Sequence, residues 1–405
     1  MILLFFVPIA IDAWSKSGEK GAAQKAEMIL QRMNDMYDKT QNIAIRPDKI
    51  SYTAVMKAWV NSREKDSAEK CASLLSKMEQ IYEETNDSKV KPDTIAYASV
   101  IDAFAKAGKP HLSEVVLKRL ESFSDDKDRQ PNTACYNMLM NAYGKRGFIE
   151  KCESLLEKME DSSSNSENKN TIQPNHITYT TFLDALAHYE GNAQNFNQND
   201  SKVKKAEDIL SRMIYRYREH GQHNAKPNEH TWNTMIFIYA KSNKLPKKFL
   251  GALDVFRRME EFGAKPNIVT YNSLMNSCNF VPVHEREMAL HAALTLFESL
   301  HGNNNKYAVK ANSTTYKSIM NICHVSPSPV NEKLMMIRDI FKKCCHDGRV
   351  NQIILAILRK SVPNELFWEL LGLEERSTDV LLSDLPWEWS CNADKKRMHN
   401  HSKNK

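Results

Sequence analysis

Apolar residues recur along the chain at the spacing of one helix face. A stripe at i, i+3, i+4 and i+7 starts at each of several aromatic residues, as it does from Tyr52 to Trp59. A second stripe follows and opens with a small residue, as it does from Cys71 to Met78. This period is typical of helices and not of strands. Because neither helix could bury its stripe alone, the pattern predicts helical pairs that stack on one another.

A short phrase precedes each aromatic residue: a proline (Ala311 in the last copy), then Asp or Asn, then three further residues. The aromatics stand at intervals of 45, 39, 43, 53, 39 and 45 residues, at Tyr52, Tyr97, Tyr136, Tyr179, Trp232, Tyr271 and Tyr316. Asp and Asn are good N-caps, and the proline keeps an upstream helix from continuing. Recurrence at such a period indicates a repeat architecture. We therefore predict an all-α chain that forms a right-handed α-solenoid of stacked helix-turn-helix repeats.

The register of the phrase divides the chain into five parts. We expect a truncated or atypical first repeat over 1–48, six repeats over 49–312, a degenerate last repeat over 313–348, a C-terminal helical cap over 349–390 and a basic disordered tail over 391–405. The polar runs 161–170 and 190–200 are predicted to be mobile loops. Val7 stands where Tyr52 stands, so we interpret the first repeat as cut off or mis-started, with any targeting sequence missing.

Composition narrows the class of protein without defining its ligand. The formal net charge is +6, which is compatible with RNA but does not indicate it. The eight cysteines include no C-x-x-C, and most fall on the predicted core stripes, which favours free thiols in a reducing compartment. The chain has no phosphate-binding glycine loop, no H-E-x-x-H and no deaminase-type zinc signature. We therefore expect no catalytic residue, no metal site and no cofactor.

The phrase resembles a known family of repeats. The pairs Tyr136-Asn137 and Tyr271-Asn272, the Met that ends the second helix and the Lys-Pro-Asn that closes a repeat are similar to pentatricopeptide repeats. The resemblance covers roughly residues 4–345, with lengthened repeats. It implies a protein that binds single-stranded RNA, one base per repeat, and acts in RNA processing, stability or translation in mitochondria or plastids.

The resemblance also implies which side chains contact the bases. Base-reading residues would be the residue after each aromatic and the Asp or Asn that closes the same repeat: Thr53, Asp93, Ala98, Asn132, Asn137, Asn175, Thr180, Asn228, Asn233, Asn267, Asn272 and Asn312. Base-stacking residues would stand two positions before each aromatic: Ile50, Ile95, Ala134, Ile177, His230, Val269 and Thr314. Asp and Asn would serve as N-caps whether or not a base is present, so the residue after the aromatic is the more informative of the two.

The family's pairing logic implies a base preference for most repeats. Thr53 with Asp93 resembles a guanine reader and Thr180 with Asn228 an adenine reader, whereas two Asn residues resemble a pyrimidine reader. Ala98 with Asn132 is no clear code word, and neither are Pro8 and Lys317 in the first and last repeats. The implied site is guanine, any base, pyrimidine, adenine, pyrimidine, pyrimidine.

Two other functions stay open at this point. The chain could be a protein-binding helical scaffold, or a non-catalytic subunit of an RNA-processing complex that works with RNA-processing enzymes or ribosomal proteins. The aligned polar side chains favour RNA, while the mild charge and the imperfect repeats keep the scaffold open. We expect a monomer that does not enter the membrane.

Overall fold

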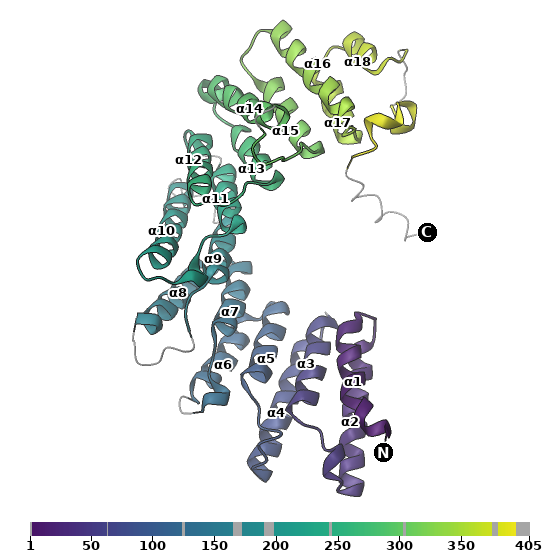
Figure 1. Ribbon diagram of the computed structural model, residues 1–405, viewed down its shortest axis with the longest axis vertical. Helices are drawn as coiled ribbons and strands as arrows, with labels where there is room; N and C mark the ends of the chain where they lie inside the picture. Colours follow the sequence, from purple (N-terminus) through teal and green to yellow (C-terminus); the bar gives the residue numbers. More distant parts are fainter. Residues whose placement is uncertain are drawn as a thin grey trace. The chain divides into compact units, whose positions relative to one another are not determined.

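The chain is entirely helical in the part that the structure describes. The computed structural model describes residues 2–62, 64–123, 126–164, 172–189, 198–242, 245–302, 305–374 and 380–393. These residues form 18 α-helices and six short 3-10 helices, without a strand (Figure 1). No described helix combines the length and the hydropathy needed to cross a bilayer. The prediction of an all-α chain of helix-turn-helix pairs is confirmed.

The helices fall into two compact blocks. The N-terminal block comprises residues 1–191 and 215–226, and the C-terminal block residues 192–214 and 227–405. The N-terminal block contains α1 (Ile2–Ser17), α2 (Ala22–Thr40), η1 (Ile43–Ile45), α3 (Lys49–Ser62), α4 (Ser67–Thr85), α5 (Thr94–Lys106), α6 (Pro110–Glu121), η2 (Lys127–Arg129), α7 (Thr133–Lys145), α8 (Ile149–Ser164), α9 (His176–His188) and η3 (His223–Ala225).

The C-terminal block begins inside repeat 5, residues 176–228, when the atypical repeat over 1–48 is counted as repeat 1. It contains most of α10 (Gln198–Arg218), then α11 (Glu229–Lys241), α12 (Lys248–Glu261), α13 (Ile268–Cys278), η4 (Val283–Glu285), α14 (Arg286–His301), α15 (Ser313–Val325), α16 (Val330–His346), α17 (Gln352–Ser361), α18 (Asn364–Leu371), η5 (Leu382–Asp384) and η6 (Trp387–Trp389). The last turn of α10, from Tyr215, belongs to the N-terminal block.

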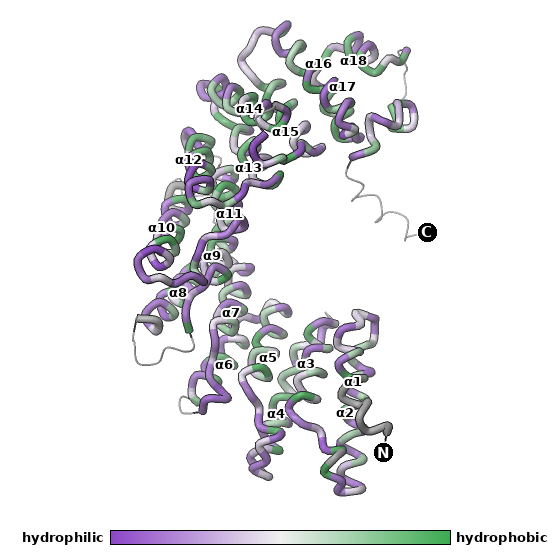
Figure 2. The backbone as a smooth tube through the Cα atoms, in the orientation of Figure 1, coloured by the Kyte–Doolittle hydropathy of each residue, from purple (hydrophilic) through white to green (hydrophobic). Residues whose placement is uncertain are grey.

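Within each block the first helix of a pair packs on its own second helix and on the first helix of the next pair. The first helices α1, α3, α5, α7 and α9 follow one another in the N-terminal block, and α11, α13, α15 and α17 do so in the C-terminal block (Figure 1). Hydrophobic and hydrophilic residues alternate along the helices, as amphipathic packing requires (Figure 2). Each block is therefore an α-solenoid in which the first helices form one layer.

The aromatic residue of each phrase lies in the core of this stack. All seven are at most 6% exposed. The small residue that opens the second stripe lies against the first helix: the thiol of Cys71 donates to the carbonyl oxygen of Met56 at 3.4 Å, and the hydroxyl of Ser113 donates to that of Ile101 at 3.0 Å. All eight cysteines are free thiols, and six of them are buried, as the sequence predicts.

Tyrosine hydroxyls link several repeats to the one before. The hydroxyl of Tyr97 donates to Glu79 at 2.6 Å, and that of Tyr136 donates to Glu121 at 2.7 Å. Both carboxylates stand on the second helix of the preceding repeat. Burial raises the pKa of the Tyr97 hydroxyl, and the Glu79 carboxylate raises it further, so the hydroxyl stays protonated and remains a donor. These bonds help to fix the register in which successive repeats stack.

Three segments differ from the sequence-based expectation. Helix α8 extends to Ser164 and α10 begins at Gln198, so the prediction of a loop is wrong for 161–164 and 198–200. A polar run can extend an amphipathic helix by a turn at little cost, because its side chains need not be buried. The rest of both runs lies outside the described residues. The expected disorder is also wrong for 391–393, because the backbone N–H of Asn392 donates to the carbonyl oxygen of Gly348 at 2.9 Å.

The predicted C-terminal cap begins like another repeat. Helix α17 packs on α15 as α15 packs on α13. The side chain of Asn351 accepts from the backbone N–H of Ile354 and caps the start of α17. The segment that follows α18 returns to this point, since the N–H of Val350 donates to the carbonyl oxygen of Trp389 at 2.8 Å. We propose that α17, α18 and this segment close the hydrophobic end of the stack.

Candidate nucleic-acid interface

The closing Asp or Asn of each repeat caps the first helix of the next one. The side chains of six such residues accept backbone N–H bonds in the first turn: Asp93, Asn132, Asn175, Asn228, Asn267 and Asn312. Four of the Asn residues form capping boxes with the Thr three positions later. The cap directs Oδ1 into the helix and leaves Nδ2 as the other hydrogen-bonding group of each Asn; Nδ2 of Asn267 donates to the Glu229 carboxylate at 3.3 Å.

Three of the predicted base-reading pairs come together in the structure. The Nδ2 amide of Asn272 donates to Oδ1 of Asn312 at 3.2 Å. The same bond is 3.5 Å long from Asn137 to Asn175 and from Asn233 to Asn267. Each bond joins the first turn of one first helix to the cap of the next. The predicted reading positions therefore lie side by side along the layer of first helices within each block.

In the C-terminal block, a threonine of the next first helix donates a hydrogen bond to the first Asn of each pair. The hydroxyl of Thr270 donates to Oδ1 of Asn233 at 2.6 Å, and that of Thr315 donates to Oδ1 of Asn272 at 2.7 Å. Oδ1 of Asn137 is buried and has no hydrogen-bond partner among the described residues. A buried acceptor without a donor is costly, so Asn137 presents an acceptor that a ligand could satisfy.

The remaining predicted pairs are less closely joined. The hydroxyl of Thr53 donates to the carbonyl oxygen of Lys49 at 2.8 Å, and the carboxylate of Asp93 lies 3.7 Å from Nζ of the same lysine. The hydroxyl of Thr180 donates to the carbonyl oxygen of His176 at 2.6 Å. Thr180 and Asn228 belong to different blocks, so their pairing stays a prediction. Ala98 offers no polar atom beside Asn132.

The predicted stacking positions form a row of exposed side chains on the first turn of the first helices. Four of them are branched aliphatic residues that are at least half exposed: Ile50 (64%), Ile95 (56%), Ile177 (50%) and Val269 (55%). Ala134, His230 and Thr314 occupy the same position and are also exposed. Packing does not account for branched apolar side chains left in water at one recurring position. The row places an apolar surface beside each amide pair.

Two further residues occupy the capping and the stacking positions and were not predicted from the sequence. Asn351 follows Asn312 by 39 residues, the interval that also separates Asn228 from Asn267. Ile353 then stands at the stacking position and is 50% exposed. The 39-residue interval was the available signal, but Val350 replaces the proline of the phrase and a leucine replaces the aromatic.

A row of cations also went unnoticed in the sequence. Four exposed lysines end first helices eight residues after the reading position: Lys16, Lys106, Lys145 and Lys241. Lys106 pairs with Asp102 at 2.9 Å, and the ammonium of Lys241 lies over the ring of Phe237 at 5.5 Å from its centroid. These contacts position positive charge along the layer that carries the readers, where it could approach a phosphate backbone.

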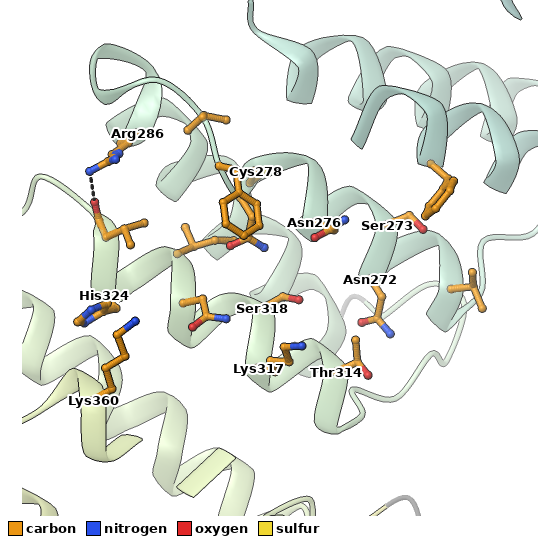
Figure 3. A pocket seen from close by; sticks show the side chains of 18 residues that line it. Asn272, Ser273, Asn276, Cys278, Arg286, Thr314, Lys317, Ser318, His324 and Lys360 are labelled. Atoms are coloured by element: carbon orange, nitrogen blue, oxygen red, sulfur yellow. Dashed lines mark hydrogen bonds between the residues drawn. The ribbon is translucent and has the colours of Figure 1, made fainter. Parts of the chain in front are cut away.

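Part of this layer is hollowed in the C-terminal block. A groove of about 600 Å³ runs along α13 and α15, and its lining includes Val269, Asn272, Thr314 and Lys317 (Figure 3). Reading and stacking positions of two successive repeats thus share one cavity. Among the described residues, no group of three or more His, Cys, Asp or Glu side chains could hold a metal ion. The side chains gathered here can donate and accept hydrogen bonds, stack and carry positive charge.

Comparisons with known proteins agree with the repeat pattern. The family model described as PPR repeat family matches residues 131–188 and 227–279, and the pentatricopeptide repeat domain model matches residues 80–146. A mitochondrial pentatricopeptide repeat-containing protein of Arabidopsis thaliana is 27% identical over 145 residues, which are 32% of this chain and 22% of the relative. The chain thus spans about a fifth of that relative's length.

Solved structures of one repeat protein are also similar. The pentatricopeptide repeat protein PPR10 in complex with an 18-nt psaJ RNA element aligns with a TM-score of 0.47 and 19% identity, over 92% of this chain and 45% of that one. PPR10 from maize aligns with a TM-score of 0.36 and 16% identity, over 88% of this chain and 50% of that one.

The fold and the aligned first turns define a helical-repeat protein whose first helices form one layer in each block. Its repeats carry the phrase, the cap and the stripes of one family, and that family's models match the chain. Residues 80–188 and 227–279 of the chain are therefore pentatricopeptide repeats.

Proposed function

We propose that the chain binds single-stranded RNA along the first turns of its first helices, one base per repeat. The proposal rests on two features that recur at fixed positions of the first helices. One is the exposed branched aliphatic residue, and the other is the hydrogen-bonded pair of Asn side chains. Helical repeats that read RNA in this way use two or three side chains per base. The aliphatic residue would lie between successive bases, and the amide pair would contact the base edge.

The caps prepare the amides for this task. Because the N-cap bond holds Oδ1 against the helix, the Nδ2 groups of Asn267 and Asn312 are oriented before any ligand arrives. Each first helix also directs its positive N-terminal end toward the same layer, where a phosphate chain would be favoured. The net charge of +6 is consistent with an anionic ligand.

The proposed site is guanine, any base, pyrimidine, adenine, pyrimidine, pyrimidine from repeat 2 to repeat 7, with repeat 2 toward the 5′ end. The name of the Arabidopsis relative places that protein in the mitochondrion, and we propose an organellar location for this chain as well. Its action would be non-catalytic: the bound transcript would be protected or presented to RNA-processing enzymes or ribosomal proteins. We propose that it does so as a monomer.

Selection from a random single-stranded RNA pool tests this function. Wild-type protein should enrich a motif that matches the proposed site, and Ile95→Ser with Ile177→Ser should weaken binding of the enriched RNA by roughly tenfold or more, because two stacking surfaces are lost. Ser76→Asp, an exposed change on a second helix, is the control for general effects. A wild-type protein that enriches no motif and binds no RNA would refute the proposal and favour the protein-binding scaffold.

A further inference from the structure

The groove along α13 and α15 has a positively charged lining without carboxylates in the part that the structure describes, unlike other parts of the layer of first helices. Its lining includes Arg286, Lys317, His324 and Lys360, and no Asp or Glu is among the described residues that line it. Lys16 and Lys106, by contrast, pair with Asp12 and Asp102 one turn earlier in their own helices. Positive charge without a carboxylate nearby favours an anionic ligand.

Three helices supply the basic groups of the groove. Lys317 stands on α15 at the reading position, and Lys360 comes from the last turn of α17. Arg286 begins α14 and donates through Nη1 to the carbonyl oxygen of Val325 at 3.2 Å, which holds the guanidinium across to α15 (Figure 3). In the same view His324 and Lys360 lie together at one end of the groove, and Lys317 lies near Asn272 at the other.

His324 adds hydrogen-bonding capacity more than charge. Burial lowers the pKa of its imidazole, and the nearby Lys360 and Lys333 lower it further. The ring is therefore neutral near pH 7, and the positive charge of the groove comes from the two lysines and the arginine. Asn272, Asn276 and Asn321 add amide donors and acceptors to the same lining.

An exposed aromatic residue stands at the edge of this groove in an unusual conformation. Phe280 lines the groove, is 81% exposed and has a φ of 55°. A left-handed backbone is strained for a bulky residue, and such strain tends to persist where a side chain has a task. Phe280 also occupies the position, eight residues after the reader, that Lys145 and Lys241 hold in repeats 4 and 6. Repeat 7 therefore has an aromatic side chain at the position where repeats 4 and 6 have a lysine.

We propose that this groove binds one further nucleotide of single-stranded RNA, next to the base at the Asn272–Asn312 pair. The base of this nucleotide does not continue the row of read bases. The phosphates on the two sides of the nucleotide lie beside Lys360 at one end of the groove and Lys317 at the other, and its base stacks on Phe280. Amide and imidazole groups of Asn321 and His324 contact the base edge. The inference rests on the proposed RNA-binding function and adds a subsite to it, on the 3′ side of the six read bases.

Two substitutions at Phe280 separate a binding role from a structural one. Phe280→Gly removes the ring and also relieves the left-handed strain, so the free protein should be as stable as wild type or more stable. Binding should nevertheless weaken, because the stacking face is lost. Phe280→Trp keeps an aromatic face and should retain affinity. Val283→Ala, an exposed change in the same loop outside the groove, is the matched control.

The experiment compares two labelled RNAs on the full chain by fluorescence anisotropy. One is the hexamer 5′-GACACU-3′, and the other carries three additional uridines at its 3′ end. We expect wild type to bind the longer RNA more tightly, and Phe280→Gly, as well as Lys317→Ala with Lys360→Ala, to weaken that binding by roughly tenfold. Binding of the hexamer should be unchanged. Lys342→Ala on the second helix α16 controls for a lost charge.

The outcomes separate the subsite from the function on which it rests. If wild type binds both RNAs with equal affinity and no variant changes this, the subsite is refuted and the reading row stands. If the groove variants weaken both RNAs equally, the 3′ placement is wrong and the inference falls. If wild type binds neither RNA, nor any RNA from the random pool, the proposed function fails and the subsite fails with it.

Discussion

At the scale of single residues, the same Asn serves the fold and the proposed reading. Its Oδ1 caps a helix, so an Asn at this position is required even without RNA, and its presence alone says little about a base. The residue after the aromatic is more informative, because no cap bond requires it. Asn137 is the strongest case, since its Oδ1 is buried without a partner among the described residues.

Asn137→Thr tests whether this position selects a base. Thr with Asn175 would resemble the adenine pair, so preference at the third base should change from pyrimidine to adenine by roughly tenfold, with the neighbouring bases unaffected. Stability should change little, because the lost Oδ1 had no donor and the lost Nδ2 bond to Asn175 is long at 3.5 Å. Titration of wild type and variant with RNAs that differ only at the third base measures the shift. Unchanged preference at that base would remove Asn137 from the reading set.

Sequence predicted these residues unevenly, for a physical reason. The cap positions follow from local chemistry, and the structure places Asn137, Asn233 and Asn272 beside their predicted partners. Whether a threonine in the next helix satisfies the reader depends on a rotamer: Thr270 donates to Asn233, whereas Thr178 donates only to its own cap, Asn175. Sequence spacing cannot show that difference.

At the scale of helices, the distance between neighbouring first helices sets the distance between readers. Helices α7 and α9 approach each other closely at Gly144, where an added Cβ would lie 2.6 Å from Cβ of Ala185. The helical stripe alone does not indicate this approach, because Gly144 lies one residue beyond the repeating apolar positions. A single missing Cβ thus allows repeats 4 and 5 to stack closely.

Gly144→Ala should therefore destabilise the protein despite the higher helix propensity of alanine. We expect a loss of about 1–3 kcal/mol from the forced separation of α7 and α9, larger than the gain of up to about 1 kcal/mol from propensity. Adding Ala185→Gly should recover much of the loss, because the space is then returned. Urea unfolding of the single and double variants measures both values. A Gly144→Ala protein more stable than wild type would show that the helices separate without cost.

At the scale of the whole chain, the sequence predicted the succession of helical repeats but not their division into two blocks. The period of the phrase gave the succession of helical pairs, and each block stacks its first helices in that order. The division into two compact blocks falls within repeat 5, in the long polar run after α9 and again inside and after α10. Composition marks that run as unable to join the core, but it does not say how the packing around it is divided.

Stacking by nearest neighbours predicts how damage spreads. Met78 is fully buried on α4, so Met78→Asp places an unpaired charge in the core and should cost several kcal/mol. Because α4 packs on α3 and α5, amide hydrogen exchange should speed up first in those two helices, while α13 and α15 of the C-terminal block keep their protection. Ser76→Asp introduces the same charge at an exposed position of α4 and should leave exchange unchanged. Equal loss of protection in both blocks would mean that the chain unfolds as one cooperative unit, and the nearest-neighbour description would then be wrong for this protein.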